Sequence, residues 1–464
     1  MSKQSPRAEG KQSPRAGGKQ SPRAEGKQSP RAGARQVALM VLARVRRDAA
    51  YSNLALSGEL SRQRHLSSAD RGLATELVYG TLRHQRFLDH AIDGLLKSKK
   101  ALDPEVRDIL RVATYQLLML DRVPRYAVVN EAVDAARRLR GAHVGGFVNA
   151  ILRRMGDNPP SRSACDDLAL RCSLPDALAR EFVAQCGAEE GEKLAEALLL
   201  PASLIGRVNT TRGSREEAAT TLQGEGAKVE PVDYAPAGLR ISGFGGAFES
   251  DSYLHGLWTA QDEAAQLVTL LLEAKRGERV LDACAGVGGK ATHLAELCDE
   301  PVVCWDVNAR KLQLLEEHAL RLGVRCETRV GDFTTSGDDV KGDFDCVLVD
   351  APCSGIGVLR RHPELKWREA SNRAELVALQ RRLLTRAIAA LKPGGRLVYS
   401  VCTITEEEGP QQLAWALERF GEVSLEAPTD DARLLGLAPT GELRLWPHRH
   451  GMDGFYAMRL KKKE

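Results

Sequence analysis

Residues 347–355 read Val-Leu-Val-Asp-Ala-Pro-Cys-Ser-Gly, and residues 397–403 read Leu-Val-Tyr-Ser-Val-Cys-Thr. Each stretch is an apolar run, rich in β-branched residues, that ends in a turn of small residues carrying a cysteine. This pattern is typical of a buried strand with the cysteine at its carboxyl end. Open α/β sheets bind their ligands at that edge. The two stretches therefore predict a sheet domain with Cys353 and Cys402 at its functional edge.

The residues around these stretches alternate between strand and helix patterns from Trp258 onward. The pattern predicts strands at 279–284, 301–306, 326–330, 345–350 and 396–401. It also predicts helices at 309–322 and 373–391, and a helix after the first strand that ends near residue 297. Strands separated by helices are expected to form a parallel sheet. We therefore predict a Rossmann-like, doubly wound α/β domain over residues 251–464.

A glycine-rich turn follows the first predicted strand; its residues are Cys284, Ala285, Gly286, Val287, Gly288, Gly289 and Lys290. Such a turn lets the backbone approach a ligand at a helix N-terminus. Its spacing fits neither the dinucleotide fingerprint nor the full phosphate-binding loop, which disfavours nicotinamide cofactors and nucleoside triphosphates. Asp306 could bind ribose hydroxyls and Asp332 an adenine amine, although either could instead cap a helix. S-adenosylmethionine fits this pattern.

Two thiols and a carboxylate beside a methyl donor suit methylation of a pyrimidine at C5. Cytosine C5 is a poor nucleophile, and a thiolate that adds to C6 activates it. Asp350 could contact the base, and a base must later remove the C5 proton so that the thiol can leave. The spacing alone does not say which thiol attacks. The alternative for a cysteine is a small buried apolar residue, which we expect for those within predicted elements: Cys298, Cys304, Cys326 and Cys346.

Residues 3–34 consist of four repeats of Lys-Gln-Ser-Pro-Arg-Ala-(Glu/Gly)-Gly, the last ending in Ala34, without a large apolar side chain, which predicts a disordered basic tail, residues 1–34. The chain has a net charge of +4, but the tail holds 8 Lys/Arg against 2 Asp/Glu. The remainder is slightly acidic, so net charge does not argue for nucleic acid.

The 10 cysteines lack the density of a disulfide scaffold and the paired spacing of a zinc site, so we expect reduced thiols and no metal. No apolar run approaches the ~18–20 residues of a membrane span, and the N-terminus lacks a hydrophobic signal segment. The sequence predicts a cytoplasmic protein.

Residues 35–160 carry apolar side chains at helical spacing and predict a compact all-α domain. This domain resembles the NusB fold of RNA-binding antitermination factors in the segments 76–83, 111–117, 123–124, 130–133 and 146–153. The resemblance implies an RNA-binding domain. Residues 161–250 mix helix and strand patterns, from which we predict a small α/β linker subdomain.

Further motifs resemble those of RNA 5-methylcytosine methyltransferases. They are Asp282-x-Cys284-Ala285-x-x-Gly288-Gly289-Lys290, Asp350–Gly355, Ser400–Thr403, Arg360–Trp367 and Asp453–Ala457. Together with a NusB-like domain they give the arrangement of the RsmB (Sun/Fmu) family, which methylates a cytosine of small-subunit (16S) ribosomal RNA. The resemblance implies the same reaction here, with S-adenosylmethionine as cofactor and ribosomal RNA as partner.

The same resemblance implies roles for single residues. It assigns the nucleophile to Cys402, release of the product to Cys353 and contact with the target base to Asp350. It places the cofactor against Cys284–Lys290, Asp306, Asp332 and Asp350. Val287 stands where the family usually has proline, and we do not expect this difference to remove activity.

A basic patch follows the first cysteine turn: Arg360, Arg361, His362, Lys366 and Arg368. We predict that these side chains contact RNA phosphates, the alternative being a solvated loop. Two other functions remain open: the same reaction on transfer RNA, and a non-catalytic RNA-binding assembly factor. The presence of both cysteines disfavours the second. Nothing in the sequence indicates an obligate protein partner.

Overall fold

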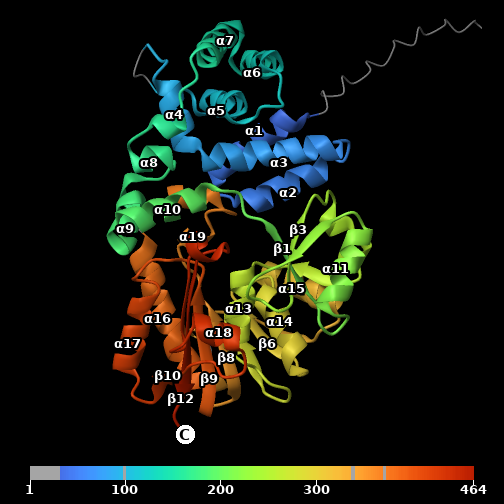
Figure 1. Ribbon diagram of the computed structural model, residues 1–464, viewed down its shortest axis with the longest axis vertical. Coiled ribbons are helices and arrows are strands. Elements are labelled where there is room, and N and C mark those ends of the chain that lie inside the picture. Colours follow the sequence, from blue (N-terminus) through green and yellow to red (C-terminus); the bar gives the residue numbers. More distant parts are fainter. Residues whose placement is uncertain (1–31, 98–100, 336–339, 369–371) are drawn as a thin grey trace, which may run out of the picture.

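The computed structural model describes residues 32–97, 101–335, 340–368 and 372–464. A helical domain lies above a larger α/β domain, and a small α/β unit lies between them (Figure 1). The predicted tail, residues 1–34, lies outside the described residues except for its last three. Two of these, Ala32 and Ala34, are buried in the helical domain. The end of the repeat is therefore already part of the folded chain.

The predicted all-α N-terminal domain is confirmed. Its helices are α1 (Ala34–Asp48), α2 (Ser52–Arg62), α3 (Ser68–Arg83), α4 (Gln85–Asp93), α5 (Pro104–Met119), α6 (Arg125–Arg140) and α7 (Ala142–Asp157). Local sequence sets their ends: Asp103 caps α5 by accepting from the amide of Glu105, and Pro104 occupies its first turn. Among the described residues, no helix combines the length and apolar character needed to cross a membrane.

The linker subdomain contains the helices α8 (Leu168–Arg171), α9 (Asp176–Cys186), α10 (Ala188–Leu199), α11 (Arg215–Gly224) and α12 (Asp251–Leu254). Its antiparallel sheet has the order β2-β3-β1-β4, with β1 (Leu204–Val208), β2 (Lys228–Pro231), β3 (Gly238–Ser242) and β4 (Trp258–Ala260). The strand β4 lies beyond residue 250, where we predicted the subdomain to end. A three-residue strand is too short to show periodicity, so only its pairing with β1 places it in this sheet.

The larger sheet has the order β10-β12-β9-β8-β5-β6-β7. Its parallel strands are β5 (Val280–Asp282), β6 (Val302–Asp306), β7 (Cys326–Val330), β8 (Phe344–Asp350) and β9 (Leu391–Val401). The strand β12 (Phe455–Lys462) is antiparallel to β9, and β10 (Val423–Leu425) and β11 (Glu442–Leu445) pair with it. The predicted strands are confirmed, but the antiparallel edge was not predicted, so the sheet is mixed.

Helices cover both faces of this sheet, which confirms the doubly wound prediction. One face packs against α13 (Glu263–Leu271), α14 (Gly289–Cys298), α15 (Ala309–Leu322) and α18 (Ala432–Leu437). The other packs against α16 (Arg373–Ala390) and α17 (Pro410–Arg419), while the short α19 (Pro447–His450) contacts α10. Because β5, β6 and β8 are covered by helices on both faces, their sequences are continuous apolar runs instead of alternating patterns.

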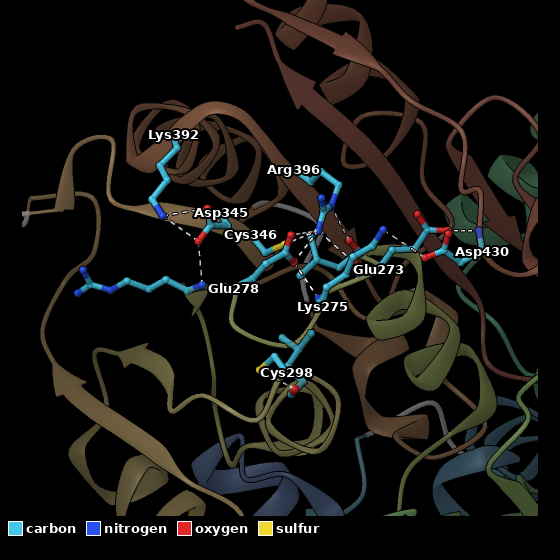
Figure 2. Close-up of polar contacts among 12 residues, drawn as sticks. Glu273, Lys275, Glu278, Cys298, Asp345, Cys346, Lys392, Arg396 and Asp430 are labelled. Atoms are coloured by element: carbon cyan, nitrogen blue, oxygen red, sulfur yellow. Dashed lines mark hydrogen bonds and ion pairs between the residues drawn. The ribbon is translucent and has the colours of Figure 1, made fainter.

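Acidic and basic side chains pair at the amino ends of β5, β8 and β9 (Figure 2). Arg396 Nη2 lies 2.6 Å from Glu278 Oε2 and 3.2 Å from Cys346 Sγ, and Lys392 Nζ lies 2.8 Å from Asp345 Oδ2. Burial raises the pKa of the Cys346 thiol to about 12. Cys346 therefore stays protonated and packs as a small apolar residue.

A buried ion pair joins the small sheet to the larger domain. Arg207 Nη1 of β1 lies 2.5 Å from Glu296 Oε2 of α14, and the two side chains are 0% and 1% exposed. Removing one member of such a pair leaves an uncompensated buried charge. Glu296→Ala is therefore expected to lower the free energy of unfolding by about 3–5 kcal/mol, as measured by urea denaturation followed by circular dichroism.

The control is Glu230→Ala, which removes the exposed partner of Arg240 at 4.0 Å. Its effect on the free energy of unfolding is expected to stay below about 1 kcal/mol. Equal losses for the two substitutions would contradict the assignment of Arg207 and Glu296 as a structural link.

Candidate active site

A cleft of about 1310 Å³ lies at the carboxyl ends of β5, β6, β8 and β9. The glycine turn, Asp306, Asp332 and both turn cysteines line it. Its outer wall is the segment Gly355–Arg368, which we call the docking loop, together with residues of α9. The predicted ligand-binding edge and the cleft thus coincide.

Cys353 and Cys402 face each other in this cleft, with their Sγ atoms 3.3 Å apart. The pairing of β8 with β9 causes this, because Asp350 lies opposite Ser400 and the chain turns just beyond each. Contact with Cys402 and burial raise the pKa of the Cys353 thiol well above its usual range. The Cys353 thiol therefore keeps its proton near neutral pH.

Asp350 forms an ion pair beside the thiols. Its Oδ2 accepts from Lys290 Nζ at 2.6 Å and its Oδ1 from Ser400 Oγ at 2.9 Å. Burial opposes the charge of Lys290, but Asp350 and then Cys402 outweigh it, so the pKa of Lys290 is raised. A permanent cation therefore lies beside Asp350 and close to Cys402.

Asp282, at the end of β5, is a second acidic group near the thiols. It belongs to the glycine-turn motif, but the sequence alone indicated no function for it. It is buried, and its Oδ1 accepts from the amide of Cys284 at 3.2 Å. Burial and the charge of Asp350 raise the pKa of Asp282 to about 7. Asp282 can thus hold a proton near neutral pH, which reduces repulsion between the two neighbouring carboxylates.

A hydrogen bond from Gly286 to Asp306, at the end of the neighbouring strand β6, holds the glycine turn in place. Asp306 accepts from the amides of Gly286 at 3.0 Å and Asn308 at 2.8 Å. Of the predicted cofactor residues, Gly288 is the one that does not line the cleft. Its φ is +86°, and an added Cβ would lie 2.5 Å from Leu315 Cγ. Gly288 therefore allows close packing on α15, while Val287, 45% exposed, lines the cleft.

Most charges of the predicted RNA patch are bound to the chain itself. Lys366 is 6% exposed, and its Nζ donates to the Arg83 carbonyl oxygen at 2.6 Å. Arg361 lies 2.6 Å from Asp453 and 2.7 Å from Asp262. Arg360 donates to backbone carbonyl oxygens at 201, 451 and 452. These contacts compete with the predicted phosphate contacts of all three residues.

The remaining members of the patch lie against the helical domain. The Arg368 guanidinium lies 4.1 Å from the centre of the Tyr51 ring and donates to the Ala49 carbonyl oxygen. His362 packs edge-on against the same ring and lies 3.6 Å from Glu364. The sequence did not reveal these contacts, because nothing in it indicates that the helical domain packs on this loop.

Two charges of the docking loop meet helix ends of opposite sign. Glu364 accepts from the amide and hydroxyl of Ser52, the first residue of α2, at 3.0 and 2.8 Å. Lys366 donates to the last residue of α3. The dipole of α2 favours the Glu364 carboxylate, whereas burial and the charge of Arg83 lower the pKa of Lys366 to about 7, so Lys366 is only partly charged. The helical domain therefore holds one wall of the cleft in place.

Sequence reasoning also missed Glu408, a fully buried side chain that contacts both cysteine turns. It is the third of three consecutive glutamates, Glu406–Glu408. Their sequence alone does not distinguish which of them enters the core. The hydrogen bond from the buried Tyr399 hydroxyl to the Glu408 carbonyl oxygen holds this residue in the core.

Three sequence-family models match the chain. One described as 16S rRNA methyltransferase RsmB/F matches residues 269–461. The NusB family model matches residues 32–157, and one for the ferredoxin-like domain of RsmF/B-like methyltransferases matches residues 174–246. The matches follow the three structural units.

Individual proteins are similar over most of the chain. Probable ribosomal RNA small subunit methyltransferase B of Bacillus subtilis (strain 168) is 34% identical over 92% of this chain and 98% of its own length. Ribosomal RNA small subunit methyltransferase B of Vibrio cholerae is 33% identical over 86% of this chain and 92% of its own. The crystal structure of PH0851 has a TM-score of 0.79 and 27% identity, covering 93% of this chain and 99% of that one.

Proposed function

Because the chain belongs to the ribosomal RNA small subunit methyltransferase B family, we propose that it methylates C5 of a cytosine in small-subunit ribosomal RNA through a covalent cysteine adduct. The observation that carries this proposal is the pair of thiols, Cys353 and Cys402, 3.3 Å apart beside the Asp350–Lys290 ion pair. A methyltransferase acting on nitrogen or oxygen needs no such thiol pair, because those atoms are already nucleophilic.

The cleft also suits the methyl donor. Asp306 and Asp332 line it at the ends of neighbouring strands, and the turn from Cys284 to Gly286 lines it as well. We propose that Asp306 binds the ribose, that Asp332 lies at the adenine and that the turn holds the methionine part of S-adenosylmethionine. The bound cofactor supplies the methyl group.

Cys402 is the proposed nucleophile. Its thiolate forms a bond to C6 of the cytosine, and the electron pair of the 5,6 double bond becomes available at C5 for methyl transfer. Lys290 places a positive charge near Cys402, and the Cys353 thiol can donate to it, so both stabilise a thiolate at this position. Asp350 is proposed to orient the base.

Cys353 is the proposed group for product release. The principal cause of its raised pKa is contact with Cys402. That contact changes when the Cys402 sulfur is bound to C6, so Cys353 can release its own proton to solvent in the cleft, and the resulting thiolate can accept the C5 proton. Loss of that proton restores the 5,6 double bond, and the bond between Cys402 and C6 breaks to release the thiolate.

Bisulfite sequencing tests the function directly. The enzyme is incubated with labelled methyl donor and unmethylated small-subunit ribosomal RNA or transfer RNA. Label at a single cytosine of the ribosomal RNA, resistant to bisulfite conversion, is expected. Label only in transfer RNA would exclude the proposed substrate, and label in neither RNA would exclude the proposed reaction.

A further inference from the structure

Glu408 is a 0% exposed carboxylate that lies between the two cysteine turns. Its Oε1 accepts from the amide of Ser354 at 2.9 Å and from Gln380 Nε2 at 3.1 Å. Its Oε2 accepts from Ser354 Oγ at 2.5 Å and from Thr405 Oγ1 at 3.0 Å. The Glu408 carboxylate thus accepts hydrogen bonds from the turn after β8, the turn after β9 and the helix α16.

These contacts control the positions of the sulfur atoms. Ser354 directly follows Cys353, and Thr405 comes three residues after Cys402. Ser354 Oγ also lies 2.9 Å from Thr403 Oγ1, which joins the two turns directly. Because every donor is fixed by buried backbone or packed side chains, the carboxylate can satisfy all of them in one orientation only. The separation of the two thiols therefore depends on Glu408.

The charge of Glu408 also acts on the thiols. It contributes, after Cys402 and burial, to the raised pKa of the Cys353 thiol. Among the described residues, the charged or titratable groups that face it include Arg373 of α16, which pairs with Glu181 and lies 3.5 Å from Glu407, and Tyr399 of β9. The Tyr399 hydroxyl donates to the Glu408 carbonyl oxygen at 2.7 Å, and burial raises its pKa well above the usual range. Tyr399 is therefore neutral, and Glu408 is the anion nearest the turns on this side.

We propose that Glu408 is a positioning residue for methyl transfer, which fixes the separation of Cys353 and Cys402 and, by its negative charge, disfavours a thiolate on Cys353. The inference rests on the proposed function for the role of Cys402 in catalysis. The unequal reactivity of the two thiols, in contrast, is a property of the free enzyme.

Two substitutions separate the two effects of Glu408. In Glu408→Gln the amide oxygen can accept from the Ser354 amide and Gln380, while the amide nitrogen can donate to the hydroxyls of Ser354 and Thr405. This variant keeps the contacts and loses the charge. Glu408→Asp keeps the charge but withdraws the carboxylate by one methylene, so it loses the contacts.

The charge effect is measured by alkylation with iodoacetamide, without RNA or methyl donor, followed by mass spectrometry of the cysteine peptides. In the wild-type protein Cys402 is expected to react first near neutral pH. In Glu408→Gln the initial alkylation rate of Cys353 is expected to rise by about tenfold, which corresponds to a pKa lower by one unit. An unchanged Cys353 rate, or a wild-type Cys353 that reacts as fast as Cys402, would overturn the proposal.

The positioning effect is measured by the kinetics of methyl transfer. Glu408→Asp is expected to lower kcat about 100-fold with little change of KM for RNA. The control Glu407→Gln changes the neighbouring side chain, which is 46% exposed, and is expected to keep wild-type kcat. If Glu408→Asp does not fold, Ser354→Ala removes one donor of the same network and should also lower kcat.

Wild-type kcat in folded Glu408→Asp, or in Ser354→Ala where the first does not fold, would overturn the positioning role. Absence of methylation by the wild-type protein would instead exclude the proposed function. The alkylation pattern would still report on Glu408 in that case, so the two failures are distinguishable.

Discussion

Cys402→Ala is expected to reduce methyl transfer to small-subunit ribosomal RNA by about 10⁴-fold or more, because it removes the group proposed to form the bond to C6. Cys353→Ala should still form that bond but lacks the group proposed to take the C5 proton. A covalent protein–RNA adduct should therefore accumulate in Cys353→Ala and be absent in Cys402→Ala. Denaturing gel electrophoresis with labelled RNA measures both.

The matched control is Cys346→Ala. It changes a buried cysteine near the amino end of β8, the strand whose carboxyl end leads to Cys353. It is expected to keep the wild-type rate and to show no adduct. An adduct in Cys402→Ala and none in Cys353→Ala would exchange the two roles. Equal activity of all three variants would exclude thiol catalysis.

Asp350→Asn is expected to lower kcat/KM by about 10²–10³-fold. The substitution removes the charge that pairs with Lys290 at 2.6 Å, and with it the proposed contact to the base. Asp350 raises the pKa of Lys290 against the effect of burial. The pKa of Lys290 should therefore be lower in the variant, and Lys290 should lose its charge at a lower pH. The alkaline limb of the pH profile of kcat/KM should therefore move to lower pH.

The control for this prediction is Asp345→Asn on the same strand. Asp345 pairs with Lys392 at 2.8 Å at the edge away from the cleft (Figure 2). Its loss should leave kcat/KM and the pH profile unchanged. A wild-type profile in Asp350→Asn, or the same shift in Asp345→Asn, would contradict the role of Asp350.

Local patterns predicted the larger domain well. The helix at 309–322 and the strand at 326–330 have the predicted bounds, because amphipathic or alternating segments carry their own boundary signals. The strand β12 was missed as part of this sheet. Its antiparallel position between β9 and β10 depends on pairing over long sequence distances, which periodicity does not report.

The basic patch also has contacts that its local sequence does not report. Charged residues after a catalytic turn suggested phosphate contacts, whereas Lys366 is buried against the end of α3 and the half-buried Arg361 pairs with Asp262 and Asp453. A charge can be buried only where partners compensate it. Those partners, the end of α3 and the side chains of Asp262 and Asp453, are distant in sequence, so the patch alone could not reveal them.

The sequence by itself determined the α/β architecture, the helical domain and the two strand-end cysteines, because periodicity and turn residues are local properties of the chain. It placed Cys353 and Cys402 at the same edge without distinguishing them. Only the tertiary structure decided their environment: Lys290 lies near Cys402, and burial and contact raise the pKa of Cys353. Burial and the positions of distant charges set the reactivity of a thiol, and both are fixed only when the chain has folded.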